Sequence, residues 1–184
     1  MTGLTPFNTV GPFFKVMLRH RPEGSDSLVT DATSGERITI EGRLTDGAGA
    51  PILDGLVEIW QADAEGRYRH PGDPRGGGAD PHFTGFGRVS TGVDGTFAFH
   101  TIKPGIVSEE QAPHILVSVL ARGIMTRCWT RLYFEDEDLN RIDSILAIVP
   151  AERRDTLLAR RIADGRYRFD IVLQGERETV FLDA

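Results

Sequence analysis

Several features are missing from this chain of 184 residues. It has a single cysteine, Cys128, so no disulfide can form within it. No apolar run is long enough to span a membrane, and the first residues lack the basic flank and apolar stretch of a signal peptide. No basic block offsets the formal net charge of −6, which argues against nucleic acid and anionic membranes as partners. These absences favour a cytoplasmic protein.

The composition is that of a globular domain, with 40% hydrophobic and 26% charged residues. The length is sufficient for one hydrophobic core. Residues 1–35 are rich in Pro, Gly, Ser and Asp without sustained periodicity, which predicts an irregular arm. The arm contains two neighbouring aromatic residues, Phe13 and Phe14, and needs a surface to lie on, for which a partner chain is the natural candidate. We expect one β domain over residues 36–184.

Short apolar or alternating stretches separated by turn signals predict seven or eight strands. The stretches cover residues 37–44, 56–61, 85–90, 96–101, 114–120, 127–134 and 167–173. Val93-Asp94-Gly95 is a hairpin signal, because glycine tolerates the positive φ of such turns. Only residues 142–162 could hold helices, and we expect short helices near 136–162. Many strands and little helix predict an all-β fold with an antiparallel β-sandwich core.

Common catalytic motifs of nucleophilic and phosphate chemistry are missing. There is no Gly-x-Ser-x-Gly elbow, and Cys128 lies within a predicted strand, where a buried and inert thiol is expected. The glycine run at residues 76–78 has no Lys-Ser or Lys-Thr after it and opens no helix, so it is no phosphate loop. This run is expected to be a flexible loop.

The histidines do not suggest a metal site by their spacing. They are His20, His70, His82, His100 and His114. A strand offers two imidazoles to one metal when they are two residues apart, but the residue at that distance from His114 is Leu116. By itself His114 therefore indicates a core or edge histidine, and Tyr68, Tyr133 and Tyr167 indicate packing residues.

Several ordered motifs nevertheless point to one family. The segment from Val57 to Tyr68, Val-Glu-Ile-Trp-Gln-Ala-Asp-Ala-Glu-Gly-Arg-Tyr, resembles the signature of the intradiol ring-cleavage dioxygenases. Further motifs in that family's order are Phe86-Gly87-Arg88, Thr101-Ile102-Lys103-Pro104-Gly105, Ala112-Pro113-His114-Ile115, Thr130-Arg131-Leu132-Tyr133-Phe134 and Tyr167-Arg168-Phe169-Asp170-Ile171. The resemblance extends over nearly the whole chain and implies a β-sandwich core.

The resemblance also implies an iron site that this chain cannot complete. Catalytic members hold Fe(III) with two tyrosinates and two histidines. Tyr68 and His114 occupy two of these four positions, but Val107 and Leu116 occupy the others, and Gln111 stands where an arginine is expected. Two donors should not retain ferric iron. We therefore interpret Tyr68 and His114 as vestigial metal positions and expect no metal and no complete catalytic set in this chain.

The resemblance is greatest to the non-iron-binding subunits of the two-chain members. It implies an iron-bearing beta partner that cleaves 3,4-dihydroxybenzoate with O2 to a carboxymuconate. The arm and a late-strand arginine would then complete the wall of the partner's site. The residues implied for this wall are Thr9, Gly11, Pro12, Phe13 and Arg131.

Three alternatives stay open at this point. Arg131 could hold the substrate carboxylate through its guanidinium fork, or it could bridge Glu135 or Asp136 as a structural residue. The chain could be a stand-alone dioxygenase whose atypical iron site includes His82 or His100. It could also be a binding module without enzymatic function, although that reading leaves the arm and the Trp60–Tyr68 segment unexplained.

Overall fold

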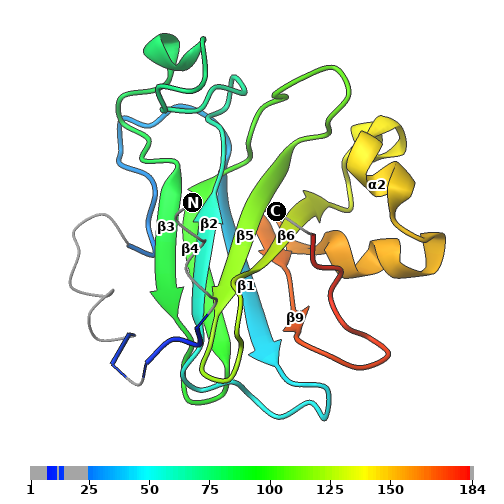
Figure 1. Ribbon diagram of the computed structural model, residues 1–184. Coiled ribbons are helices and arrows are strands. Elements are labelled where there is room, and N and C mark those ends of the chain that lie inside the picture. Colours follow the sequence, from blue (N-terminus) through cyan, green and yellow to red (C-terminus); the bar gives the residue numbers. More distant parts are fainter. Residues whose placement is uncertain (1–7, 12, 15–24, 183–184) are drawn as a thin grey trace, which may run out of the picture.

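The computed structural model describes residues 8–11, 13–14 and 25–182 (Figure 1). Its strands are β1 (Arg37–Thr45), β2 (Leu56–Trp60), β3 (Phe86–Ser90), β4 (Thr96–Ile102), β5 (His114–Leu120), β6 (Cys128–Phe134), β7 (Leu158–Ala163), β8 (Arg166–Arg168) and β9 (Ile171–Val172). The named helices are η1 (Gly76–Gly78), η2 (Asp138–Ile142), α2 (Ser144–Ile148) and η3 (Ala151–Leu157). Among the described residues, every helix is far too short to cross a bilayer.

The strands form one mixed sheet that is rolled toward a barrel, in the order β3-β2-β5-β6-β7-β8-β1-β4, with β9 beside β1. Strands β2, β3, β5 and β6 lie in front in Figure 1, and β1 and β4 lie behind them. The prediction of an all-β fold is confirmed. The antiparallel core that was expected is only partly present, because β7 runs parallel to β6, and β8 and β9 run parallel to β1. The described residues form nine strands where seven or eight were expected.

The parallel pair β6–β7 has a physical reason in the connection between its strands. A parallel neighbour needs a crossover of about a dozen residues or more. The chain from residue 135 to 157 supplies this crossover with η2, α2 and η3. Short helices were expected near 136–162 and are present up to Leu157, but residues 158–163 are the strand β7. The expected two separate sheets are therefore joined through β7 into one.

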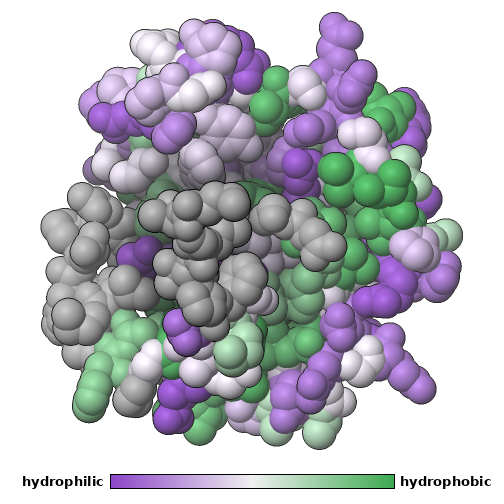
Figure 2. Space-filling view, in the orientation of Figure 1, coloured by the Kyte–Doolittle hydropathy of each residue, from purple (hydrophilic) through white to green (hydrophobic). Residues whose placement is uncertain are grey.

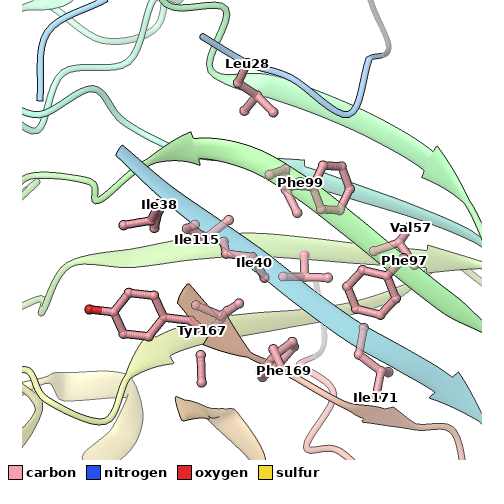
Figure 3. Packing of buried hydrophobic residues seen from close by; sticks show 14 of the residues in the cluster. Leu28, Ile38, Ile40, Val57, Phe97, Phe99, Ile115, Tyr167, Phe169 and Ile171 are labelled. Carbon is pink, nitrogen blue, oxygen red and sulfur yellow. The ribbon is translucent and has the colours of Figure 1, made fainter. Parts of the chain in front are cut away.

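The core fills the space between the front and back strands (Figure 3). Strand β1 points Ile38, Ile40, Gly42 and Leu44 inward, as its alternation predicts. A side chain at Gly42 is excluded because an added Cβ would lie 1.9 Å from the carbonyl oxygen of Phe169. The position is therefore restricted to glycine by the close approach of the β8–β9 segment.

Other segments complete the domain around this core. Leu28, in the stretch predicted as an arm, is buried in the core, and its backbone N–H donates to the carbonyl of His100. On the outer surface, exposed apolar side chains gather over η2 and α2, among them Ile142 and Ile148 (Figure 2). This surface lies on the crossover between β6 and β7.

Candidate active site and arm

A cavity of about 470 Å³ opens on the outer face of β2, β5 and β6, below the long loop that follows β2. Three of its residues stand side by side across the sheet, because Trp60 pairs with Leu116 and Leu116 pairs with Arg131. The sheet register therefore gives the cavity an apolar floor with a guanidinium at one side. Loop residues Tyr68 and Val107 and the first residue of β5 complete this part of the lining.

Tyr68 is fixed by carboxylates of its own loop. Asp63 Oδ1 accepts hydrogen bonds from the backbone N–H groups of Glu65 and Arg67, both at 2.9 Å. Asp73 Oδ2 accepts from the backbone N–H of Tyr68, also at 2.9 Å. The ring of Tyr68 meets Trp60 edge-on, with centroids 5.4 Å apart. Burial raises the pKa of Tyr68, which Arg131 only partly offsets, so the phenol stays protonated.

The Lys-Pro-Gly turn packs directly on the Tyr68 loop. Gly66 has φ +75°, and an added Cβ would lie 1.8 Å from the carbonyl oxygen of Ile106. Gly105 approaches from the other side and donates its N–H to the carbonyl of Asp63 at 2.8 Å. These two close approaches place Val107 in the cavity lining together with Tyr68. The resemblance assigned Tyr68 and Val107 to two positions of one iron site, and the structure brings the two residues to one cavity.

His114 begins β5 and is 4% exposed. Its Nδ1 lies 2.8 Å from the carbonyl oxygen of Ala112. A carbonyl oxygen can only accept, so Nδ1 carries the proton and donates, and Nε2 keeps its lone pair. Burial lowers the pKa of His114, and the nearby Arg131 lowers it further. The imidazole is therefore neutral at pH 7.

Arg131 lies half-buried in the same cavity. Its Nη1 donates to the hydroxyl of Tyr133 at 3.4 Å, and that hydroxyl donates to Asp143 at 3.0 Å. The alternative bridge to Glu135 or Asp136 is not formed. Instead, Glu135 accepts from the backbone of Arg161, and Asp136 contacts Lys103, Arg161 and Tyr167. Within the described residues, Arg131 has no carboxylate at ion-pair distance.

The donor set of the cavity does not fit a ferric ion. Tyr68 and His114 are brought together, but the remaining two family positions are Val107 and Leu116, which have no donor atom. No group of three or more His, Cys, Asp or Glu side chains suited to a metal occurs among the residues that the structure describes. His82 and His100 are not in the cavity lining, and Nδ1 of His100 lies 3.2 Å from the hydroxyl of Thr39 on β1. The stand-alone iron site therefore has no support among the residues that the structure describes.

The arm reaches the sheet at another place. Thr9 Oγ1 accepts a hydrogen bond from the backbone N–H of Gly123 at 2.9 Å, in the turn after β5. Gly11 and Phe13 are exposed, Phe13 to 73%, and Pro12 lies outside the described residues. Arg131 pairs with Leu116, and the four residue steps from there to the end of β5 span about 13 Å, with Gly123 beyond that end. The structure thus does not bring Thr9 to Arg131.

The arginine next to the arm contact is Arg122, which the sequence analysis did not single out. It adjoins Gly123, its side chain is 59% exposed, and it pairs with Asp54. A local signal was present in the sequence, because Arg122-Gly123 directly follows a buried strand and a turn was to be expected there. The contact with Thr9 has no local signal, because it joins residues far apart in the chain.

Comparison with known proteins places the chain in one family. A family model described as "Dioxygenase" matches residues 10–175. The chain is 44% identical to the protocatechuate 3,4-dioxygenase alpha chain of Burkholderia cepacia, over 98% of this chain and 97% of that one. It is 38% identical to the beta chain from Burkholderia cepacia, over 79% and 67%. The dioxygenase domain of a carbohydrate-binding fusion protein from Streptomyces sp. SirexAA-E has a similar structure, with a TM-score of 0.64 and 30% identity over 97% of this chain and 100% of that domain. The chain therefore belongs to the intradiol ring-cleavage dioxygenase family.

Proposed function

We propose that this chain is the alpha, non-iron-binding subunit of a cytoplasmic protocatechuate 3,4-dioxygenase. In the complex, an Fe(III)-bearing beta subunit cleaves 3,4-dihydroxybenzoate between its hydroxylated carbons with O2 and yields 3-carboxy-cis,cis-muconate. The identity with an alpha chain over almost the full length of both proteins supports this assignment. The observation that carries it is the incomplete donor set, with Val107 and Leu116 at two of the four family positions.

The contribution of this chain is to build part of the partner's site with its arm. In this proposal the beta subunit is contacted by the part of residues 1–35 that precedes Leu28, since Leu28 is buried in the core of its own domain, and Thr9, Gly11, Pro12 and Phe13 form part of the wall around the substrate. Two observations support it: the bond from Gly123 holds Thr9 in place, and Phe13 presents an aromatic ring that its own chain leaves exposed. Such a wall excludes water and orients the substrate, which can be worth several kcal/mol of barrier.

A guanidinium in this chain is proposed to hold the substrate carboxylate. The resemblance points to Arg131, and the position of the arm contact adds Arg122. The variants Arg131→Met and Arg122→Met, each measured in the assembled complex, show which of the two arginines binds the carboxylate. The variant that removes the carboxylate contact raises the KM for 3,4-dihydroxybenzoate by about tenfold or more and leaves the KM for catechol almost unchanged. If neither variant shows this difference, the carboxylate is bound by the partner alone.

The experiment that tests the assignment compares the chain purified alone with the chain co-expressed with a beta-type partner. We expect colourless, iron-free protein alone, and a tyrosinate-to-iron absorption band with turnover only in the complex. Stoichiometric iron and colour in the isolated chain would overturn the proposal. A chain that neither binds the beta subunit nor changes its turnover would instead be a binding module without enzymatic function.

A second measurement tests the arm. Deletion of residues 1–14 should reduce turnover of the complex while the circular dichroism melt of the chain stays close to that of the full-length protein. Full turnover after the deletion would exclude the arm from the site. A collapsed melt would show that the arm is a structural part of this domain, and the exposed Phe13→Ala variant would then report on the partner's site by itself.

A further inference from the structure

Strands β3 and β4 are the two ends of the sheet order, and they form no ladder with each other in the part of the chain that the structure describes. A turn at residues 91–95 connects them, but β3 belongs to the front of the molecule and β4 to the back (Figure 1). Each strand therefore has an edge whose backbone N–H and C=O groups no neighbouring strand of the sheet uses. Residues 25–28, here called the strap, lie between these two edges.

The strap is bonded to β4 on one side. The N–H of Leu28 donates to the carbonyl of His100 at 2.9 Å, and the N–H of His100 donates to the carbonyl of Asp26 at 2.7 Å. Ser27 forms an isolated parallel bridge with the same residue of β4. Both backbone groups of His100 are therefore satisfied by the strap.

The strap is bonded to β3 on its other side. The N–H of Arg88 donates to the carbonyl of Ser25 at 3.3 Å. The N–H of Thr84, two residues before β3, donates to the carbonyl of Leu28 at 3.2 Å. The strap thus closes the gap that the sheet leaves between its two ends.

A single apolar side chain fastens the strap to the core. Leu28 is buried, whereas residues 25–27 are exposed. It points from the strap into the core, toward the side where Phe99 lies (Figure 3). Gly87 makes room for it, because an added Cβ there would lie 2.6 Å from Cδ1 of Leu28. Segments with so few buried contacts open locally, at a lower free energy than unfolding of the whole domain requires.

We propose that the strap is a latch, which in the free chain leaves both edges as one unit while the rest of the domain stays folded, and which a partner bound to the arm keeps closed. The second part rests on the proposed function, in which the arm before Leu28 contacts the beta subunit. The arm joins the domain at the strap, so a partner that holds the arm favours the closed state. Opening exposes the edges of β3 and β4, which are templates for pairing with another chain.

The test is hydrogen exchange of single backbone amides, followed by NMR on the full chain without a partner. The N–H groups of Arg88 and His100 are on different strands but are both bonded to the strap, so their opening constants should agree within about threefold. These constants should exceed that of Val117, in the middle of β5 between β2 and β6, by at least about tenfold. Protection of Arg88 and His100 equal to that of Val117 would refute the latch, and unequal constants would refute opening as one unit.

Two variants separate opening of the strap from unfolding of the domain. Leu28→Ala removes the buried contact and should raise the opening constants of Arg88 and His100 by about tenfold or more. Ile171→Val truncates a fully buried residue of β9 and should accelerate exchange of Val117 alone, by about two- to tenfold, because the open and the closed strap both keep the core at β9. Equal acceleration of Arg88 and Val117 by Ile171→Val would refute the latch. Should Leu28→Ala fail to fold, the wild-type chain and Ile171→Val decide the question.

Addition of a beta-type partner tests the second part. In the complex, exchange of Arg88 and His100 should slow by at least about tenfold. Unchanged exchange in a complex that turns over 3,4-dihydroxybenzoate would refute the link between partner and strap and leave the proposed function intact. Absence of any complex would refute the proposed function, whereas the exchange data on the free chain would still decide whether the strap is a latch.

Discussion

Asp143 is the residue at which we expect a small substitution to have a large effect on stability. Its side chain is 1% exposed and lies between η2 and α2. Oδ1 accepts from the backbone N–H groups of Ile145 and Leu146, both at 2.9 Å, and from the hydroxyl of Tyr133 at 3.0 Å. Oδ2 accepts from the backbone N–H of Ala112 at 2.9 Å. One carboxylate therefore joins the start of α2, strand β6 and the segment before β5.

The loss of unfolding free energy expected for Asp143→Ala is the sum of the losses at these contacts. Loss of the N-cap of α2 costs about 1 kcal/mol. The buried N–H of Ala112 loses its partner, at about 1–3 kcal/mol, and the hydroxyl of Tyr133 loses its acceptor, at about 1 kcal/mol. The expected total is about 3–5 kcal/mol, against a stability of roughly 5–15 kcal/mol for a typical domain. Asp143→Asn keeps one acceptor but turns an amide toward the N–H of Ala112, so we expect an intermediate loss of about 1–3 kcal/mol.

The assay is urea unfolding with linear extrapolation, in which the midpoint should fall and the slope should stay constant. Asp138→Ala is the matched control, because Asp138 is an exposed acid of η2 without a side-chain contact among the described residues. It should change the unfolding free energy by no more than about 0.5 kcal/mol. A loss below about 1 kcal/mol for Asp143→Ala, or an equal loss for Asp143→Ala and Asp138→Ala, would refute this reasoning.

Three further predictions concern the cavity and its loop. Folding lowers the pKa of His114, so the unfolded chain binds more protons than the folded chain just below pH 6.5. The unfolding free energy should therefore fall there with decreasing pH, by up to about 1.4 kcal/mol per pH unit. His114→Gln should flatten this dependence, and parallel curves for the two proteins would contradict the prediction. Val107→Tyr combined with Leu116→His restores four donors and should let the reconstituted chain retain ferric iron and colour, whereas a folded but iron-free variant would show that these positions do not converge. Gly66→Ala should lower the unfolding free energy more than Gly49→Ala. Both glycines have positive φ, but an added Cβ at Gly66 would lie 1.8 Å from a carbonyl of the facing turn, whereas no atom lies within 4 Å of one at Gly49. Equal losses in urea unfolding would argue against the close packing at Gly66.

The strands that the sequence predicts well are those whose pattern reflects their own burial. The alternation of β1 and the apolar run of β5 correspond to inward and buried side chains in the structure. Strand β7 was missed because only Leu158 and Ala159 are shielded from solvent, each against a different cluster, and four exposed residues follow them. Its strand conformation depends on pairing with β6 and β8, which no local pattern encodes.

The last predicted strand, residues 167–173, is interrupted for a similar reason. The N–H of Phe169 bonds the carbonyl of Glu41, and the carboxylate of Asp170 accepts from the backbone N–H of Arg43. The two residues between β8 and β9 are therefore held by β1 rather than continuing one ladder. The apolar and polar alternation of this stretch is compatible with either arrangement, so the break was not predictable.

The candidate site was predictable in its residues but not in its grouping. Tyr68 and His114 came from resemblance, and the structure does place them in one cavity. The inclusion of Arg131 in that cavity depends on the register across β2, β5 and β6, where a slip by one residue would turn it to the core. The contact of Thr9 with Gly123 joins two irregular segments, and neither has a pattern that could have indicated it.

The support of Tyr68 and His114 explains why the cavity can persist without a metal. Tyr68 is held through its backbone by Asp73 and through its ring by Trp60, and His114 is held by the carbonyl of Ala112. None of these contacts involves a metal ligand bond. The presence of a tyrosine and a histidine in the cavity is therefore accounted for by packing and hydrogen bonding within the chain. Within the described residues, these contacts use neither the hydroxyl of Tyr68 nor Nε2 of His114.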